Sequence, residues 1–260
     1  MSSDNVLDRL VAEARQETAD RRALVSLEHL ERAAALHTPR DFAGALRAPG
    51  LSVIAEMKQR TPRMGVLVED YKPGNLARAY TRGGAAAISV LTHAAGFGGR
   101  PEHIHVVREH TQLPILRKDF ITETYQVVEA RAVGADAVLL IVAALEMQEL
   151  RDLLGEVRRH GLAALVEVHN EQEAEQALLG GAEVIGVNHR DLRTFNINLG
   201  LTEQLRKVIP SNVLVVAESG IQTPDDVRRM AEAGADAILV GETLMRADDP
   251  AKRIRELTGA

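Results

Sequence analysis

The fold is decided by four similar stretches of sequence, GGAAAISV (83–90), VGADAVLL (133–140), GGAEVIGV (180–187) and AGADAILV (233–240). In each of them a glycine follows a helix-like segment and leads directly into an apolar run. Glycine can adopt the left-handed backbone conformation that ends a helix before a turn. The repeated pattern therefore predicts several copies of one unit, in which a helix is followed by a buried strand.

Outward from these stretches, strand-like and helix-like segments alternate along most of the chain. The strand-like runs are almost continuously apolar, which indicates burial on both faces, as in a parallel sheet. Eight of them occur, at 52–58, 86–91, 114–119, 137–142, 163–168, 184–188, 213–218 and 237–241. Eight such units predict an α/β fold, a closed (β/α)8 TIM barrel. An open doubly wound sheet is the alternative, but no GxGxxG follows the first strand to favour it.

Length and composition agree with one barrel. The chain has 260 residues, of which 45% are hydrophobic, and we expect a single (β/α)8 barrel domain over residues 1–260. Residues 1–47 are polar with apolar positions at helical spacing, which predicts an N-terminal helical extension.

The net charge and the absence of cysteine exclude several classes of function. The net charge of -6 is spread over interspersed acids and bases, so we expect no nucleic-acid partner. No cysteine occurs, which excludes disulfides and thiolate-bound metal. The sequence contains neither a signal-peptide pattern nor a run of roughly eighteen apolar residues. We therefore expect a cytoplasmic protein that does not contact membranes.

Several predicted strands end in charged or amide side chains that an apolar core does not need. In a TIM barrel the C-terminal ends of all strands meet at one face, where the active site lies. Glu56 and Lys58 are two residues apart and point to the same side, whereas Arg117 and Lys118 are adjacent and point to opposite sides. Ion pairs that only support the rim are the alternative. The candidates for acid–base work are Glu56, Lys58, Lys118, Glu167, Asn188 and Glu218.

Glu167 and Glu218 each stand at the end of an apolar run. Burial raises the pKa of a carboxyl group unless a nearby cation offsets the effect. We therefore expect a raised pKa for both groups unless a lysine lies beside them.

Residue types after other strands suggest how a substrate is held. Barrel enzymes often hold a phosphate on backbone N–H groups after strands seven and eight, where this chain has the glycine-containing segments 219–220 and 241–242. Two phenylalanines follow strands two and three, where they can stack on a ring or pack in the core. The substrate-binding candidates from residue type are Ser219, Gly220, Gly241, Glu242, Thr61, Arg190, Phe97 and Phe120.

Nine histidines occur, but none forms an HExxH motif, and we expect none to pair with a strand-end carboxylate. His103, His105 and His110 follow Pro101 on a predicted helix, where a solvated face is the simplest interpretation. We expect no metal site.

With these residues in hand, the chain resembles the indole-3-glycerol phosphate synthase family of tryptophan biosynthesis. The similar segments are VIAEMK, AISVLT, PILRKDFI, ADAVLLIVAAL, LVEVH, GVNHRDL, ESGI and VGETLMRADDP, in the family's order and spacing, and the similarity extends from RRALVSLEHLE almost to the C-terminus. The resemblance implies a decarboxylating lyase that converts 1-(2-carboxyphenylamino)-1-deoxyribulose 5-phosphate to indole-3-glycerol phosphate, with loss of carbon dioxide and water. It implies a phosphorylated small-molecule substrate and no cofactor, and it suggests other tryptophan-pathway enzymes as partners.

The resemblance also implies roles for individual residues. Lys118 is the expected general acid for the ketone oxygen, and Glu167 orients it or transfers a proton. Lys58, paired with Glu56, is expected to hold an anionic group and to protonate the departing hydroxyl. Sugar hydroxyls are assigned to Asn188 and Glu218, and the substrate carboxylate to Arg190. The phosphate site comprises Thr61, Ser219, Gly220, Gly241 and the Glu242 backbone, and the ring is enclosed by Phe97, Phe120, Leu139 and Leu192.

Departures from the family pattern lie in loops. The family's K-x-x-S-P-S-K-G is KQRTPRMG at 58–65, its F-x-G-S is FGGR at 97–100, and its N-N-R or N-S-R is NHR at 188–190. The first departure loses a serine and a lysine, so phosphate affinity and loop closure are the properties it puts in doubt. Neither the second nor the third departure removes a catalytic charge.

Three alternative functions stay open from the sequence. A paralogue that serves a secondary indole pathway would perform the same reaction. An isomerase of a phosphoribosyl-anthranilate or related sugar phosphate would share the fold and phosphate site but needs a different acid–base pair, and its cysteine-using form is disfavoured because the chain has no cysteine. A catalytically idle barrel would bind a phosphorylated ligand, but it would be free to lose Lys118 or Glu167, and both are present.

Overall fold

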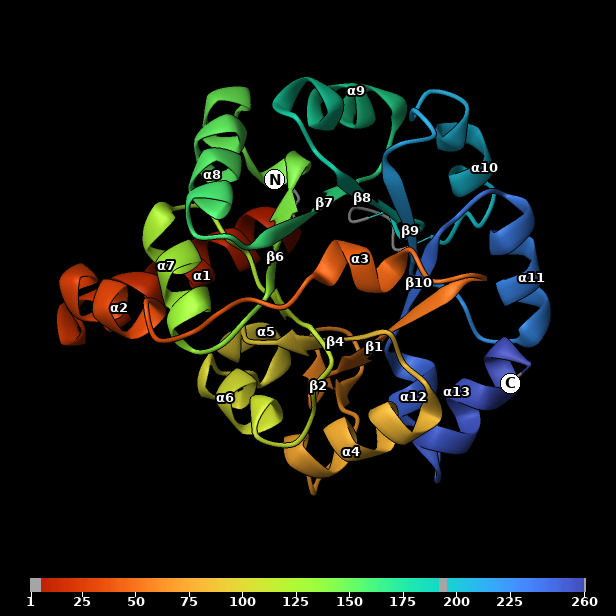
Figure 1. The fold of residues 1–260 in the computed structure, drawn as a ribbon, viewed down its shortest axis with the longest axis horizontal. Coiled ribbons are helices and arrows are strands. Elements are labelled where there is room, and N and C mark those ends of the chain that lie inside the picture. Colours follow the sequence, from red (N-terminus) through yellow and green to blue (C-terminus); the bar gives the residue numbers. More distant parts are fainter. Residues whose placement is uncertain (1–5, 192–195, 260) are drawn as a thin grey trace, which may run out of the picture.

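The computed structural model describes residues 6–191 and 196–259. Eight parallel strands close into a barrel in the order β1-β10-β9-β8-β7-β6-β5-β4 (Figure 1). They are β1 (Ser52–Met57), β4 (Ala87–Leu91), β5 (Ile115–Lys118), β6 (Ala137–Ile141), β7 (Ala163–Val168), β8 (Val184–Asn188), β9 (Leu214–Glu218) and β10 (Ala237–Val240). The predicted TIM barrel is confirmed, with each strand close to its expected position.

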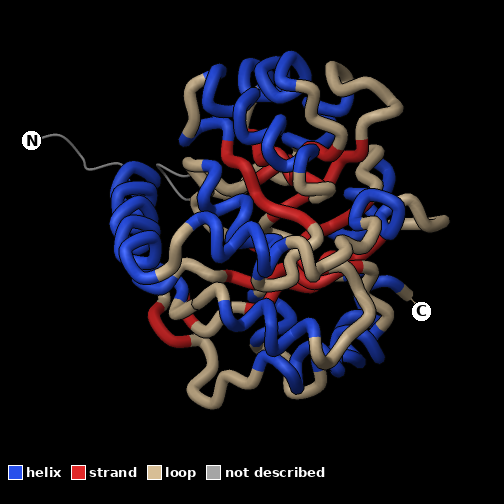
Figure 2. Tube along the Cα trace, turned by 60° about the vertical axis from the view of Figure 1, so that its left-hand side comes forward, coloured by secondary structure: helices blue, strands red, loops and turns tan. Residues whose placement is uncertain are grey.

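Helices cover the outside of the barrel, and strands lie within this layer in both views (Figures 1 and 2). After the strands come α4 (Pro73–Gly83), α5 (Ala94–Phe97), α6 (Glu102–Arg108), α7 (Thr124–Ala132), the 3-10 helix η1 (Val142–Ala144), α8 (Met147–Arg159), α9 (Glu171–Gly180), α10 (Leu201–Arg206), α11 (Pro224–Glu232), α12 (Glu242–Met245) and α13 (Pro250–Thr258). A separate two-stranded sheet, β2 (Arg60–Thr61) and β3 (Gly65–Val66), follows β1.

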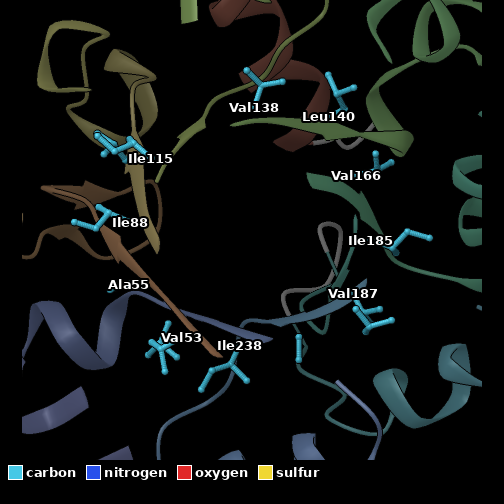
Figure 3. Packing of buried hydrophobic residues seen from close by; sticks show 14 of the residues in the cluster. Val53, Ala55, Ile88, Ile115, Val138, Leu140, Val166, Ile185, Val187 and Ile238 are labelled. Atoms are coloured by element: carbon cyan, nitrogen blue, oxygen red, sulfur yellow. The ribbon is translucent and has the colours of Figure 1, made fainter. Parts of the chain in front are cut away.

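Along each strand, successive side chains pack alternately into two hydrophobic clusters. One cluster lies between strands and helices, and Figure 3 shows its members pointing away from the barrel axis, among them Val53, Ile88 and Ile185. A second cluster fills the barrel interior and includes Ile54 and Leu116. Because successive strand residues point to opposite sides, this alternation decides which polar residues at the strand ends reach the interior.

The N-terminal segment forms α1 (Val6–Leu24), α2 (Leu27–Ala34) and α3 (Phe42–Leu46), and residues 35–41 between α2 and α3 are irregular. Phe42 and Leu46 of α3 belong to the interior cluster, so α3 closes the barrel at the end where the strands begin (Figure 1). Helix α1 lies at the edge of the molecule in Figure 2 and contacts α5 and η1, which follow strand ends. We propose that this segment is an extension of one barrel domain, because it packs on both barrel ends.

The stretches VGADAVLL (133–140) and AGADAILV (233–240) both contain GADA, and the aspartates in them make the same hydrogen bond at two places that are four strands apart. Asp136 accepts a hydrogen bond from the backbone N–H of Ile115 at 2.7 Å, and Asp236 accepts one from Val215 at 2.8 Å. Each aspartate thereby accepts a hydrogen bond from a backbone N–H group near the start of the neighbouring strand. An apolar residue at this position would leave that N–H group without a partner. The sequence repeat thus reflects a repeated strand-end contact.

Candidate active site

Strand alternation points the predicted acid–base residues into the barrel mouth. On β5, Arg117 faces helix α7 and contacts Glu129, whereas Lys118 faces the interior and contacts Glu167 and Glu218. Contacts connect six of the predicted residues into two groups at this mouth, and Gly241 lies against the second group. The resulting groups are Lys118–Glu167–Glu218 with Asn188, and Glu56–Lys58.

Lys118 lies between two carboxylates. Its Nζ is 2.7 Å from Glu218 Oε2 and 3.2 Å from Glu167 Oε2, and its side chain is only 14% exposed. Burial by itself lowers the pKa of an amine, but Glu218 and Glu167 outweigh it and raise the pKa of Lys118 well above its ordinary value. The ammonium is therefore fully charged at neutral pH.

The two carboxyl groups beside Lys118 differ in protonation. Burial raises the pKa of Glu218 and repulsion from Glu167 adds to this effect, so the value reaches about 7 despite the attraction of Lys118. Burial also acts on Glu167, but Lys118 and His169 outweigh it and hold its pKa below the ordinary range. Within this coupled pair, Glu218 is therefore the carboxyl group with the raised pKa, and Glu167 is the one with the lowered pKa.

Glycines leave room for both groups of charges. A Cβ on Gly186 of β8 would overlap Glu218 Oε1. A Cβ on Gly241, after β10, would overlap Glu56 Oε1 and lie 2.9 Å from Lys58 Nζ. Glu56 and Lys58 form a direct ion pair, so Gly241 lies against this pair and its predicted position at the mouth agrees with the structure.

Glu167 has two further partners, and one of them corrects the sequence analysis. Asn188 Nδ2 donates to Glu167 Oε1 at 3.1 Å, and His169 Nε2 lies 3.3 Å from the same oxygen. The expectation that no histidine pairs with a strand-end carboxylate was wrong. His169 follows β7 and points back toward Glu167, two residues earlier, which the alternation of strand side chains makes possible.

Arg117 is completely buried on the outer side of β5. Its Nη2 donates to Asp119 Oδ2 at 2.9 Å, and its Nη1 lies 2.8 Å from Glu129 Oε2 on α7. Arg21 of α1 in turn donates to Glu129 Oε1 at 2.7 Å. Both residues that flank Lys118 are thus fixed by ion pairs, and the N-terminal helix is connected to the end of β5.

Two phenylalanines form an aromatic wall beside the mouth. The Phe97 and Phe120 rings stack at 6.5 Å between centroids, and the His93 ring contacts Phe120 edge-on at 5.2 Å. Glu17 of α1 accepts hydrogen bonds from the first backbone N–H groups of α5, the short helix that ends at Phe97. Leu139 belongs to the interior cluster against which Phe120 packs. These residues are suitably placed to contact an aromatic ring.

The loop after β9 has unusual backbone geometry. Ser219 has φ of 66° and Gly220 has φ of 81°, and Ser219 is the single non-glycine residue with positive φ among residues 6–191 and 196–259. His189 Nδ1 lies 2.9 Å from the Ser219 carbonyl oxygen, and His189 Nε2 lies 2.7 Å from Thr202 Oγ1. His189, which departs from the family pattern, therefore supports the loop that carries Ser219.

The remaining candidates are less closely connected to the charged mouth. Thr61 lies on β2, where its hydroxyl accepts a hydrogen bond from the Met64 backbone at 3.1 Å. Glu242 begins α12 and pairs through its side chain with Arg246 at 3.0 Å. The backbone N–H of Arg190, which is half-buried, donates to Asn188 Oδ1. Leu192 lies outside the described residues.

Within the described part of the chain, no three His, Cys, Asp or Glu side chains are arranged to hold a metal ion. Of the three histidines assigned to a helix face, His105 is exposed and His110 lies just beyond α6, but His103 is half-buried and contacts the Tyr71 ring at 5.4 Å. None of the helices within residues 6–191 and 196–259 has the length and apolar character to cross a bilayer.

The fold and the charged mouth together define a (β/α)8 barrel with paired lysine and glutamate side chains at the C-terminal ends of its strands. Comparison with known proteins identifies its family. Residues 7–257 match the family described as "Indole-3-glycerol phosphate synthase". The chain is 55% identical to "Indole-3-glycerol phosphate synthase 2" of Streptomyces coelicolor, over 98% of this chain and 99% of that protein. It is 50% identical to the "Indole-3-glycerol phosphate synthase" of Nocardioides sp., over 98% of both. The chain belongs to the indole-3-glycerol phosphate synthase family.

Solved structures with low sequence identity share the fold. A thiamine phosphate pyrophosphorylase from Pyrococcus furiosus superposes with a TM-score of 0.61 at 21% identity, over 80% of this chain and 93% of that one. This similarity supports the TIM-barrel architecture.

Proposed function

We propose that this chain converts 1-(2-carboxyphenylamino)-1-deoxyribulose 5-phosphate to indole-3-glycerol phosphate, carbon dioxide and water, with Lys118 as the general acid. The observation that carries the proposal is the position of the Lys118 ammonium between Glu167 and Glu218 at the barrel mouth. Membership of the family supports the reaction, and the geometry of the mouth supports the roles that the resemblance implies for Lys118, Glu167 and Lys58.

The first step joins the ring carbon that bears the carboxylate to the ketone carbon. The ketone oxygen gains negative charge as the bond forms, and a fixed ammonium can stabilise that charge and donate a proton. The raised pKa of Lys118 does not prevent this transfer, because the alkoxide that forms is a much stronger base than an amine. Glu167, held as a carboxylate, orients Lys118 for the transfer.

The later steps remove the carboxylate as carbon dioxide and the former ketone oxygen as water. The hydroxyl group needs a second proton to leave, and Lys58 beside Glu56 is suitably placed to donate it. The ring then becomes aromatic by loss of one proton from the methylene carbon next to nitrogen. Glu218, with a pKa of about 7, is better matched to accept that proton than Glu167. Two protons are delivered and one is taken, so the reaction consumes one proton.

Substrate binding follows from the surfaces around these groups. We assign the aromatic ring to the wall formed by Phe97, Phe120 and Leu139, because these side chains offer apolar area beside the charged mouth. The phosphate is assigned to the backbone N–H groups of the loops 219–220 and 241–242, which follow the last two barrel strands. Thr61, Arg190 and Leu192 remain predicted contributors.

Two variants test the assignment by the fluorescence of indole-3-glycerol phosphate formed from the ribulose phosphate substrate. Lys118→Ala removes the acid, and Glu167→Gln removes the charge that orients it, so each should reduce kcat by a factor of roughly 100 or more. Lys207→Ala is the matched control, because Lys207 is 73% exposed and pairs only loosely with Glu203 at 4.0 Å. Near-normal turnover in both site variants, with folding intact, would rule the assignment out.

Two further properties form part of the proposal and rest on family membership alone. We propose a cytoplasmic location and association with other enzymes of tryptophan biosynthesis. Fractionation of cells and co-purification of the tagged full-length chain would test them.

A further inference from the structure

His169 is a largely buried group that has no role in the proposed reaction. It lies one residue after β7, and its side chain is 12% exposed. Its Nε2 faces Glu167 Oε1 at 3.3 Å, and its Nδ1 faces Glu173 Oε2 at 3.0 Å. The backbone N–H of His169 also donates to Glu173 Oε2 at 2.8 Å. The ring is therefore held at both nitrogens between two carboxylates.

This geometry favours a proton on both ring nitrogens, because each nitrogen lies within ion-pair distance of a carboxylate oxygen. A neutral imidazole has one nitrogen without hydrogen, and its lone pair would face a carboxylate oxygen at close range. Burial lowers the pKa of His169, but the two carboxylates outweigh burial and raise it to about 10. His169 is consequently an imidazolium cation across the neutral pH range.

The imidazolium completes the set of partners around Glu167. Lys118 from β5 contacts Oε2, whereas Asn188 from β8 and His169 both contact Oε1. Both oxygens are thereby fixed. The charged groups around this pair are Lys118, Glu218 from β9 and Glu173 from the first turn of α9.

We propose that His169 is a positioning residue, whose imidazolium is anchored by Glu173 and holds Glu167 in the orientation that presents Oε2 to Lys118. The proposal rests on the proposed function, because it assigns Glu167 the task of orienting the general acid. It adds a cation that the sequence analysis did not include, and it extends the site to the start of α9.

His169→Gln is the main test, because glutamine can still donate a hydrogen bond but carries no charge. Loss of the cation should reduce kcat roughly tenfold with little change in KM. It should also move the acid limb of the kcat/KM profile upward by about one pH unit, because the remaining carboxylates then bind a proton more tightly. Glu173→Gln leaves His169 in place but removes one of the two carboxylates that raise its pKa. This variant should shift the same limb of the pH profile by a smaller amount.

The matched control is His160→Gln. His160 is also buried and also contacts a glutamate, Glu156, at 3.1 Å, but it lies at the end of α8, before β7 begins. Its substitution should leave the pH profile unchanged. A His169→Gln profile that superimposes on the wild-type profile would overturn the proposal, even if kcat falls, because a purely structural role changes rate without moving the limb.

A second measurement does not depend on activity. NMR of the histidine side chains in the unmodified protein should show the His169 ring doubly protonated at about pH 8, assigned by the loss of its signals in His169→Gln. A neutral His169 ring at this pH would overturn the proposal. If the wild-type protein forms no indole-3-glycerol phosphate, the proposed function is wrong. The NMR measurement still tests the charge of His169 in that case, because it does not depend on activity.

Discussion

Substitution of Gly186 by alanine tests whether the position of Glu218 matters for catalysis. Gly186 lies within β8 and faces the barrel interior, where its added Cβ would overlap Glu218 Oε1 and lie 3.3 Å from Leu165 Cδ1. The carboxyl group would have to retreat by about 1 Å, which is enough to break its 2.7 Å contact with Lys118. A misplacement of about 1 Å can reduce the rate by a factor of about 100, equivalent to about 2.7 kcal/mol of activation free energy.

The overlap should also reduce stability. Adding a methyl group to a packed interior lowers the free energy of unfolding by about 1–3 kcal/mol. Steady-state kinetics by product fluorescence gives kcat and KM, and urea unfolding gives the stability. Gly155→Ala is the control: Gly155 is exposed within α8 with no atom within 4 Å of the added Cβ, so alanine should raise the unfolding free energy by about 0.5–1 kcal/mol and leave kcat unchanged. A Gly186→Ala variant with wild-type kcat would refute the requirement for the Lys118–Glu218 contact.

Three other perturbations have defined outcomes. Gly241→Ala should lower kcat roughly tenfold or more, measured in the same assay, because the new Cβ overlaps Glu56 Oε1 in its ion pair; an unchanged kcat would contradict the role given to that pair. Because the pKa of Glu218 is raised from 4.5 to about 7 in the folded protein, this group stabilises the folded state at pH below 4.5. The stabilisation is lost as the pH rises through about 7. In Glu218→Gln, the fall in unfolding free energy between about pH 5 and about pH 8 should therefore be smaller by up to about 3 kcal/mol, and an identical pH dependence of urea unfolding would disprove the assignment. Glu129→Ala should lower the free energy of urea unfolding by about 1–3 kcal/mol, because it removes one of the two carboxylates that pair with the fully buried Arg117 while Asp119 stays; an unchanged unfolding free energy would contradict the contribution given to this pair.

The fold could be predicted because local patterns and the global structure agree. Continuous apolar runs specify strands buried on both faces, and the recurring glycine joints specify where helices end. The alternation of side chains along a strand also predicted that Arg117 and Lys118 diverge, and that Glu56 and Lys58 share a side. Contacts in the structure confirm both predictions.

Some contacts could not be predicted from the sequence, and one was missed although it is local. Arg21 and Glu129 are separated by 108 residues, so only tertiary packing brings them together. His169, in contrast, has its partners two residues before it and four residues after it, where strand alternation and helical spacing place Glu167 and Glu173 on its side. The different protonation of Glu167 and Glu218 also follows from neighbours, because both residues end apolar runs in the same way.

The amino-acid sequence by itself determined that this protein is a barrel of eight βα units and that lysines and glutamates stand at its strand ends. Those properties depend on residue type and on periods of a few residues. Only the tertiary structure decided which charges meet across the barrel mouth, and that Lys118 and the neighbouring carboxylates shift the pKa values of Glu167 and Glu218 in opposite directions. The physical reason is that electrostatic interaction and desolvation depend on distances of a few ångströms and on burial, which closure of the barrel creates between residues far apart in the chain.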